Sequence, residues 1–206
     1  MARISFSKFD LATALEKVGL RKLTEWNLQV PPKQPSAFFS EKMQRLRRFD
    51  TARSEGAKLL IADALFEEAI QPYAKLRIFK ETTITSTDTG GLVDYLIAPD
   101  GTVPIMPFLC VSEAKKDDFD KGLAQCLVEM QACFEINQQA NHLGVIFGMV
   151  TNGTAWQFYR RAVSGEVFES PSYSLLQTPE ILGILDYIFA ECERELPTLT
   201  PPLRRQ

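Results

Sequence analysis

The sequence predicts an α/β protein, in which a mixed central sheet is flanked by helices on both faces (α/β/α) and preceded by an N-terminal helical extension. Three observations lead to this prediction. Helical periodicity dominates the first part of the chain, extended segments separated by turns follow, and a long amphipathic helix then separates them from further strands and a last helix. Because helices and strands alternate along the chain, we expect helices to cover both sides of the sheet.

The composition is that of one ordinary folded domain. The chain has 206 residues, of which 45% are hydrophobic, with 23 basic and 26 acidic side chains and a net charge of −3. These values disfavour disorder, collagen and coiled coil, and they exclude a protein held to nucleic acid by its net charge. We divide the chain into a helical extension (1–50), a core (51–196) and a flexible tail (197–206).

The sequence predicts a cytoplasmic protein without a membrane segment. The clearest apolar run, 145–150, is far shorter than the roughly 20 residues of a spanning helix, and Lys8 and Asp10 interrupt the N-terminus where an export signal would be apolar. The only histidine is His142, and no cysteine lies in a C-x-x-C pair, which argues against structural zinc and a disulfide scaffold. We expect reduced, mostly buried thiols at Cys110, Cys126, Cys133 and Cys192.

Three helices are expected before the first strand. Apolar residues repeat at helical spacing in three segments, and prolines in 30–35 predict a linker between the first two. Ser40 and Ser54 are suitable N-caps for the second and third helices. These helices are predicted over 11–26, 41–49 and 54–69.

The rest of the chain is expected to be mainly strands. Gly90-Gly91 is expected to interrupt the first two strands, Pro99-Asp100-Gly101 to turn a hairpin between the second and third, and Thr151-Asn152-Gly153 to turn another. The predicted strands are 76–85, 92–98, 103–114, 143–150 and 155–162. Two further helices are predicted, over 121–136 and from Thr178-Pro179 onward.

Charged side chains follow an apolar strand in the middle of the chain. Glu113 and Lys115 share one face of the predicted strand, and Asp94 lies on the neighbouring strand of the same hairpin. Such charges are costly at the end of a buried strand unless they are paired or used. Two carboxylates and the Ala114 carbonyl would form an all-oxygen site that suits Mg²⁺ or Mn²⁺, with Lys115 beside a metal-bound water. The alternative is a buried ion pair without chemistry.

The order of these residues resembles the PD-(D/E)XK nuclease superfamily. Glu55 on a helix precedes Asp94, Glu113-Ala-Lys115 and then Gln125 on the next helix. Together with Lys116, Thr151-Asn152-Gly153 and Trp156, this order looks most like the nuclease domain of type I restriction enzyme R subunits. The resemblance spans roughly half of the chain, from Ser54 to Tyr159.

The resemblance implies a restriction-endonuclease-like fold, a divalent metal and hydrolysis of a DNA phosphodiester bond. It implies that Asp94 and Glu113 bind the metal, that Lys115 faces the water or phosphate, and that Glu55 completes the outer shell of the metal. Gln125 matches the glutamine of the Gln-x-x-x-Tyr motif.

The sequence departs from the family pattern at two positions, and several roles have alternatives. Glu129 stands where the motif has Tyr, and Val93 precedes Asp94 where the family name has Pro. Gln125 faces away from the apolar stripe of its helix, so either solvent or a site at the sheet edge is open to it. The helix acid could equally be Glu67 or Glu68 instead of Glu55, and Trp156 fits a core position.

A basic helix face is the candidate for DNA contact. Lys42, Arg45 and Arg48 recur every three residues, and Lys116 is a further candidate for backbone phosphate. The alternative is a solvated face with ion pairs to Glu41 and Asp50. No base-reading module is recognisable, so specificity would come from loops or a protein partner. A homodimer stays open.

We therefore expect a Mg²⁺- or Mn²⁺-dependent endonuclease-like protein acting on DNA, in the setting of a restriction or defence system. The alternative is an inactive nuclease-fold module that binds nucleic acid or a protein partner. The two hypotheses differ in whether the acidic residues bind a divalent ion.

Overall fold

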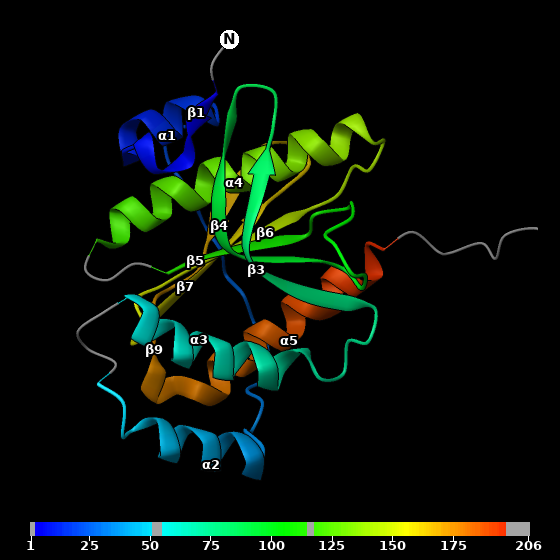
Figure 1. Ribbon diagram of the computed structural model, residues 1–206. Helices are drawn as coiled ribbons and strands as arrows, with labels where there is room; N and C mark the ends of the chain where they lie inside the picture. The colour runs from blue at the N-terminus through cyan, green and yellow to red at the C-terminus, as the bar shows by residue number, and fades with distance from the viewer. Residues whose placement is uncertain (1–2, 51–54, 115–117, 197–206) are drawn as a thin grey trace, which may run out of the picture.

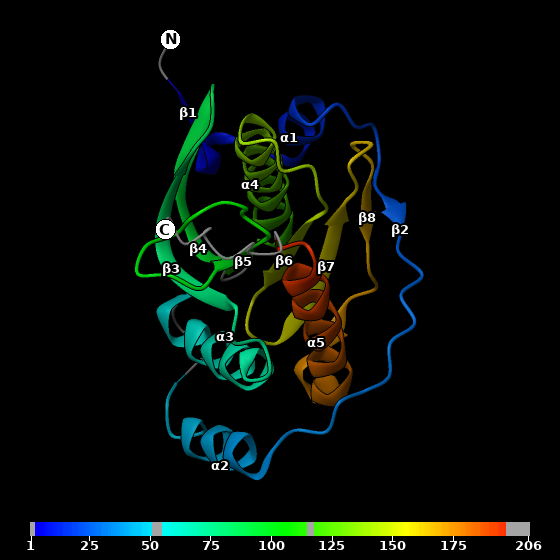
Figure 2. The same ribbon diagram turned by 90° about the vertical axis from the view of Figure 1, so that its right-hand side faces the viewer.

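The computed structural model describes residues 3–50, 55–114 and 118–196, and these residues form a mixed α/β fold. Helices α1 and α4 cover one face of a central sheet, whereas α3 and α5 cover the other, and α2 packs on the outer side of α3 (Figures 1 and 2). The five α-helices of the described residues are α1 (Leu11–Lys17), α2 (Ala37–Leu46), α3 (Glu55–Ile70), α4 (Phe119–Gln139) and α5 (Thr178–Arg194). The predicted sheet with helices on both faces is confirmed.

The sheet of the described residues has nine strands in the order β1-β4-β5-β6-β7-β8-β2, with β3 paired to β4 and β9 paired to β7. β4 and β5 are antiparallel, β5 and β6 are parallel and joined through α4, and β6 and β7 are antiparallel. The strands are β1 (Ile4–Ser5), β2 (Thr24–Glu25), β3 (Leu76–Thr85), β4 (Thr89–Pro99), β5 (Cys110–Ala114), β6 (Ile146–Thr151), β7 (Ala155–Arg161), β8 (Val167–Glu169) and β9 (Tyr173–Ser174). Two 3₁₀ turns are η1 (Phe6–Lys8) and η2 (Leu175–Gln177).

The two faces of the sheet bury different side chains. Beneath α3 and α5, Phe66 lies at the centre of an aromatic cluster, with its ring centroid 4.8 Å from that of Tyr95 and 5.9 Å from that of Trp156. Trp156 is fully buried there, which agrees with the core position expected for it. Beneath α4, the core consists mainly of aliphatic and sulfur-containing side chains, including Val111, Cys126 and Met130.

The N-terminal residues are part of the sheet as well as helical. β1 pairs with the start of β4, β2 pairs with β8, and α1 packs on α4. An extended segment then crosses α5 on its way to α2, where the Lys33 N–H donates to the Pro179 carbonyl at 2.8 Å and the Lys33 ammonium pairs with Asp186. The Pro31 carbonyl passes so close to Gly183 that a Cβ there would lie 2.3 Å from it. The N-terminal residues therefore pass from one edge of the sheet (β1) to the other (β2) and then to α2.

The first two helices have bounds that differ from the predicted ones. The first ends at Lys17 rather than 26, because the chain turns at Gly19 with a φ of 74°. The second begins at Ala37, since the Ser36 hydroxyl, not that of Ser40, accepts from the Phe39 N–H and caps the helix. The predicted N-cap Ser54 and the tail 197–206 lie outside the described residues.

The second and third predicted strands also have bounds that differ from those in the structure. Gly90 and Gly91 do not interrupt the sheet but lie within β4, and the chain turns instead at 86–88, where the Ser86 N–H donates to the Thr89 carbonyl. The strand expected over 103–114 is formed only by Cys110–Ala114. Pro104 and Pro107 explain this difference, because proline has no N–H to donate to a sheet ladder.

Four cysteines are present and all are buried without disulfides, as expected from their spacing. Burial raises the pKa of each thiol, which favours the unreactive protonated form. Among the described helices, none is long and apolar enough to cross a membrane.

Candidate active site

Adjacent strands bring Asp94 and Glu113 side by side. Tyr95 pairs with Ser112 in the β4–β5 ladder, and the same register places Asp94 opposite Glu113. Both residues lie two positions from core residues under α4, Leu96 and Val111 respectively, so both carboxylates are on the α4 face of the sheet. The hairpin predicted from the sequence therefore creates the expected pair of neighbouring carboxylates.

The two carboxylates differ in their surroundings. Asp94 is half-buried, and its Oδ2 atom accepts a 2.8 Å hydrogen bond from the Ala114 N–H. This bond fixes Asp94 against the last residue of β5. Glu113 is only 1% exposed, although the strand that carries it ends one residue later. The pair therefore extends from the interior toward the surface at this end of β5.

Helix α4 adds two buried polar side chains above this pair. Gln125 and Glu129 lie one helical turn apart and are 6% and 0% exposed. The Gln125 amide donates from Nε2 to Glu129 Oε1 at 3.0 Å. Gln125 is therefore buried, which excludes solvent, one of the two environments left open for it.

A glycine in the neighbouring strand lets α4 lie close to the sheet. A Cβ at Gly148 would be 2.7 Å from Cys126 Sγ and 2.4 Å from Met130 Sδ, both on α4. Each of these residues is adjacent in sequence to one member of the Gln125–Glu129 pair. The close approach at Gly148 therefore sets how deeply that pair sits over the strands.

Negative charges dominate the surroundings of Glu129. Burial raises the pKa of Glu129 well above its ordinary value, and the charges of Glu113 and Asp94 raise it further, whereas the hydrogen bond from Gln125 lowers it. The combined effect favours a protonated Glu129 carboxyl. Three acidic side chains from β4, β5 and α4 thus interact at one place.

Of three other predicted residues, two lie outside the described residues and one is described only by its backbone. Lys115 and Lys116 lie outside the described residues, directly after β5. Glu55 begins α3, and only its backbone is described. One turn further along α3, Lys58 lies against Gly153, in the turn that follows β6. The start of α3 therefore lies at the edge where the parallel strands β5 and β6 end.

The alternative helix acids have other partners. Glu67 pairs with Lys42, and Glu68 accepts hydrogen bonds from the N–H and the hydroxyl of Ser36, at 2.7 and 2.9 Å. These contacts hold α2 against α3.

The candidate DNA-binding face of α2 is largely engaged in ion pairs. Besides the Lys42–Glu67 pair, Arg45 pairs with Glu41 within the helix, while Arg48 is exposed. Because α2 packs on the outer side of α3, this face lies in a different layer from Asp94 and Glu113 (Figure 2).

The donor set at the end of β5 fits a magnesium ion. Within residues 3–50, 55–114 and 118–196, no three His, Cys, Asp or Glu side chains are grouped to hold a metal by themselves. Mg²⁺, however, is commonly bound by one or two carboxylates and keeps several waters. Gln125 Oε1 is buried and accepts no hydrogen bond from any described residue, so it could accept one from such a water.

Glu129 is the site residue whose role the sequence left unassigned. In the sequence, Glu129 stands out only as a departure from the Gln-x-x-x-Tyr motif. The spacing of four residues from Gln125 does place it on the same helix face, and this was the available signal.

No known protein family and no curated protein matches the sequence.

Proposed function

We propose that the protein is a divalent-metal-dependent endonuclease that hydrolyses DNA phosphodiester bonds, with a restriction-endonuclease-like core formed by the sheet, α3 and α4. The observation that carries this proposal is the pair of carboxylates from adjacent strands near the C-terminal end of β5. The buried polar residues of α4 support it, because they surround the same place with oxygen atoms suited to a hard cation.

In this proposal each residue has a defined task. Asp94, Glu113 and the Ala114 carbonyl hold Mg²⁺ or Mn²⁺, and Glu55 completes its outer shell. The bound ion would lower the pKa of a water molecule and stabilise negative charge on the phosphate. Lys115 orients that water, and Lys116 contacts the DNA backbone. Gln125 and Glu129 are positioning residues that fix Glu113 from above.

The proposal is tested by cleavage of supercoiled plasmid and of a linear duplex in Mg²⁺ or Mn²⁺. We expect cleavage that EDTA abolishes and that Asp94→Asn or Glu113→Gln reduces by about 100-fold or more. Lys115→Ala should have a comparable effect.

A matched control lies on the same helix. Glu135 accepts a 3.0 Å hydrogen bond from Gln131 Nε2, one turn earlier on α4, so Glu135→Gln makes the same chemical change in a similar pair elsewhere. It should leave the cleavage rate unchanged. Absence of cleavage by the wild type, or equal cleavage by all variants, would exclude the catalytic proposal. Calorimetry showing no Mg²⁺ binding would favour the inactive binding module.

A further inference from the structure

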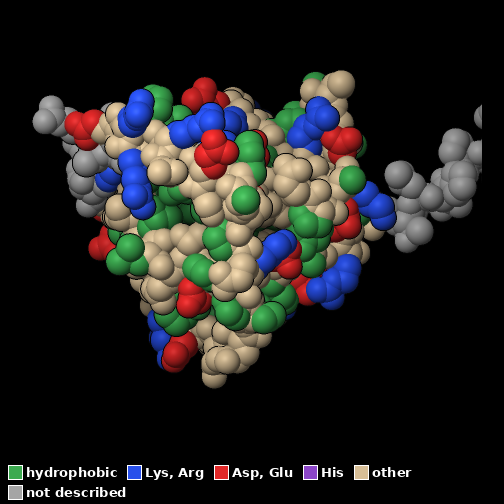
Figure 3. Space-filling view, turned by 90° about the horizontal axis from the view of Figure 1, so that it is seen from below, with side chains coloured by type: hydrophobic (Ala, Val, Ile, Leu, Met, Phe, Trp, Pro, Cys, Tyr) green, Lys and Arg blue, Asp and Glu red, His purple; other side chains and the backbone are tan. Residues whose placement is uncertain are grey.

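A groove of about 610 Å³ opens between α2 and the 3₁₀ turn η2, on the face of the molecule seen in Figure 3. This volume is within the range of specific binding sites. Seven of its eleven lining residues are apolar, and they come from the segment before α2, from α2 and α3, and from η2. The apolar lining consists of Pro35, Phe39, Met43, Leu46, Ile61, Leu175 and Leu176.

One apolar side chain of this lining is held out in solvent. Leu176 is 95% exposed, because η2 turns it away from the core. The Leu176 side chain therefore buries almost none of its surface within the fold, unlike the other apolar residues that line the groove. It would become buried only if another molecule covered the groove.

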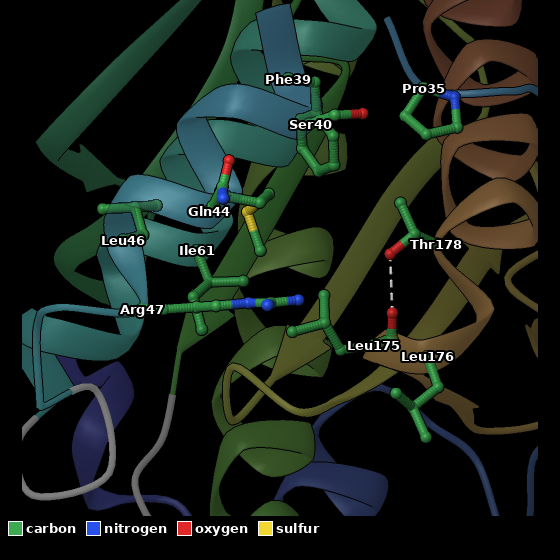
Figure 4. Close-up of a pocket in the computed structure, with 11 residues that line it drawn as sticks. Pro35, Phe39, Ser40, Gln44, Leu46, Arg47, Ile61, Leu175, Leu176 and Thr178 are labelled. Carbon is green, nitrogen blue, oxygen red and sulfur yellow. Dashed lines mark hydrogen bonds between the residues drawn. The ribbon is translucent and has the colours of Figure 1, made fainter. Parts of the chain in front are cut away.

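Arg47 gives the groove a positive charge. It is the one charged residue of the lining, and its guanidinium extends from the end of α2 across the groove toward Leu175 (Figure 4). Among the residues described, no acid pairs with Arg47, whereas Lys42 and Arg45 on the same helix pair with Glu67 and Glu41. An apolar groove with an uncompensated arginine is complementary to a ligand that combines apolar and acidic groups.

We propose that this groove binds an acidic amphipathic peptide segment of a partner protein. The apolar side chains of the segment contact Leu176 and the floor of the groove, and an Asp or Glu pairs with Arg47. The apolar floor argues against DNA, whose backbone is contacted by polar and basic side chains. The charged residues of the tail 197–206 are Arg204 and Arg205, whose charge does not complement Arg47. This inference is independent of the proposed nuclease activity.

The test begins with a displayed library of random 16-residue peptides selected on the full chain. Enriched sequences should combine at least two large apolar residues with an acidic one. A fluorescein-labelled synthetic copy of the most enriched peptide then gives affinities by anisotropy. Arg47→Glu and Leu176→Ser should each weaken its binding by about tenfold, and both residues are exposed, so the fold should be kept.

Two controls separate the groove from general charge effects. Arg21→Glu makes the same charge change at an exposed position outside the groove and should leave affinity within about twofold. A peptide with its acid replaced by Lys should bind Arg47→Glu better than the wild type.

Three results would overturn the proposal. The first is enrichment without this apolar and acidic pattern, and the second is affinity that neither groove substitution changes. The third is a different occupant: a fluorescent 20-base-pair duplex whose binding depends on both residues would assign the groove to DNA, and self-association in sedimentation that Leu176→Ser abolishes would assign it to a second copy.

Discussion

Helix α4 carries two Gln–Glu pairs with the same spacing and the same hydrogen bond, at 3.0 Å in each case, but in opposite electrostatic surroundings. The pair Gln131–Glu135 is half-buried and lies beside a cation, since Arg161 Nε donates to Gln131 Oε1 at 3.0 Å. The pair Gln125–Glu129 is buried beside two more carboxylates.

The difference lies in what the described residues supply to each pair. At the Arg161 end the protein supplies both the positive charge and the hydrogen-bond donor. At the other end the described residues supply neither to Gln125 Oε1, and Glu129 faces Glu113 and Asp94. A buried oxygen such as Gln125 Oε1 is costly to leave without a donor, and a water molecule bound there would supply one.

The largest expected difference concerns cleavage. Gln125→Ala removes a side chain that positions Glu129 and, through it, Glu113, so we expect the initial rate of plasmid cleavage to fall by about 10- to 100-fold. Gln131→Ala, the same change in the other pair, should leave the rate within about twofold. Equal losses in the two variants, after thermal melts show both folded, would remove the functional distinction between the pairs.

The second prediction removes the cation beside the Gln131–Glu135 pair, so that this pair, like Gln125–Glu129, has no positive charge from a described residue next to it. Arg161 is buried, and its guanidinium also lies 3.7 Å from the centre of the Phe134 ring. Arg161→Met should lower the free energy of unfolding in urea by about 1–3 kcal/mol, because Gln131 Oε1 loses its donor and the cation–π contact is lost. Arg161→Lys keeps the charge but not the planar group, so its free energy of unfolding should lie between those of the wild type and Arg161→Met. Unchanged stability in Arg161→Met would show that the cation does not support this pair.

The smallest expected effect is a pH trend, measured by urea unfolding in EDTA. In the folded state the pKa of Glu129 is raised, so above about pH 4.5 the unfolded state releases a proton that the folded state keeps. Wild-type stability is therefore greatest below this pH and decreases as the pH rises toward the folded pKa. Glu129→Gln cannot ionise, so its stability relative to the wild type should increase from pH 5 to pH 8. The same trend in Glu135→Gln would contradict the assignment to Glu129.

The core of the fold was predictable because local sequence determines it. β3 was predicted with its observed bounds, and α4 and β7 nearly so, because their periodicity is uninterrupted. The helix N-terminus at Ser36 and the continuity of β4 through Gly90 were missed. Both depend on contacts with distant segments: Ser36 also binds Glu68, and a Cβ at Gly91 would be 2.9 Å from the Phe6 ring.

The candidate site was predictable only in part. Asp94 and Glu113 follow from the alternation of side chains along two strands that were predicted to pair, and the structure shows them adjacent. The burial of Gln125 and Glu129 could not be read from their helix, since it depends on the close approach of α4 to Gly148. The ion pairs of Lys42 and Arg45 were anticipated only in part, because Glu67 comes from another helix.

The path of the N-terminal residues has a consequence for synthesis on the ribosome. Thr24 pairs with Phe168, and Lys33 with Asp186, so the segment 24–33 finds these partners only about 150 residues later. At about 5–20 residues per second, this segment waits roughly 7–30 s for those partners. This early segment is therefore placed late, and its apolar side chains, such as Trp26 and Leu28, lack their final contacts during that interval.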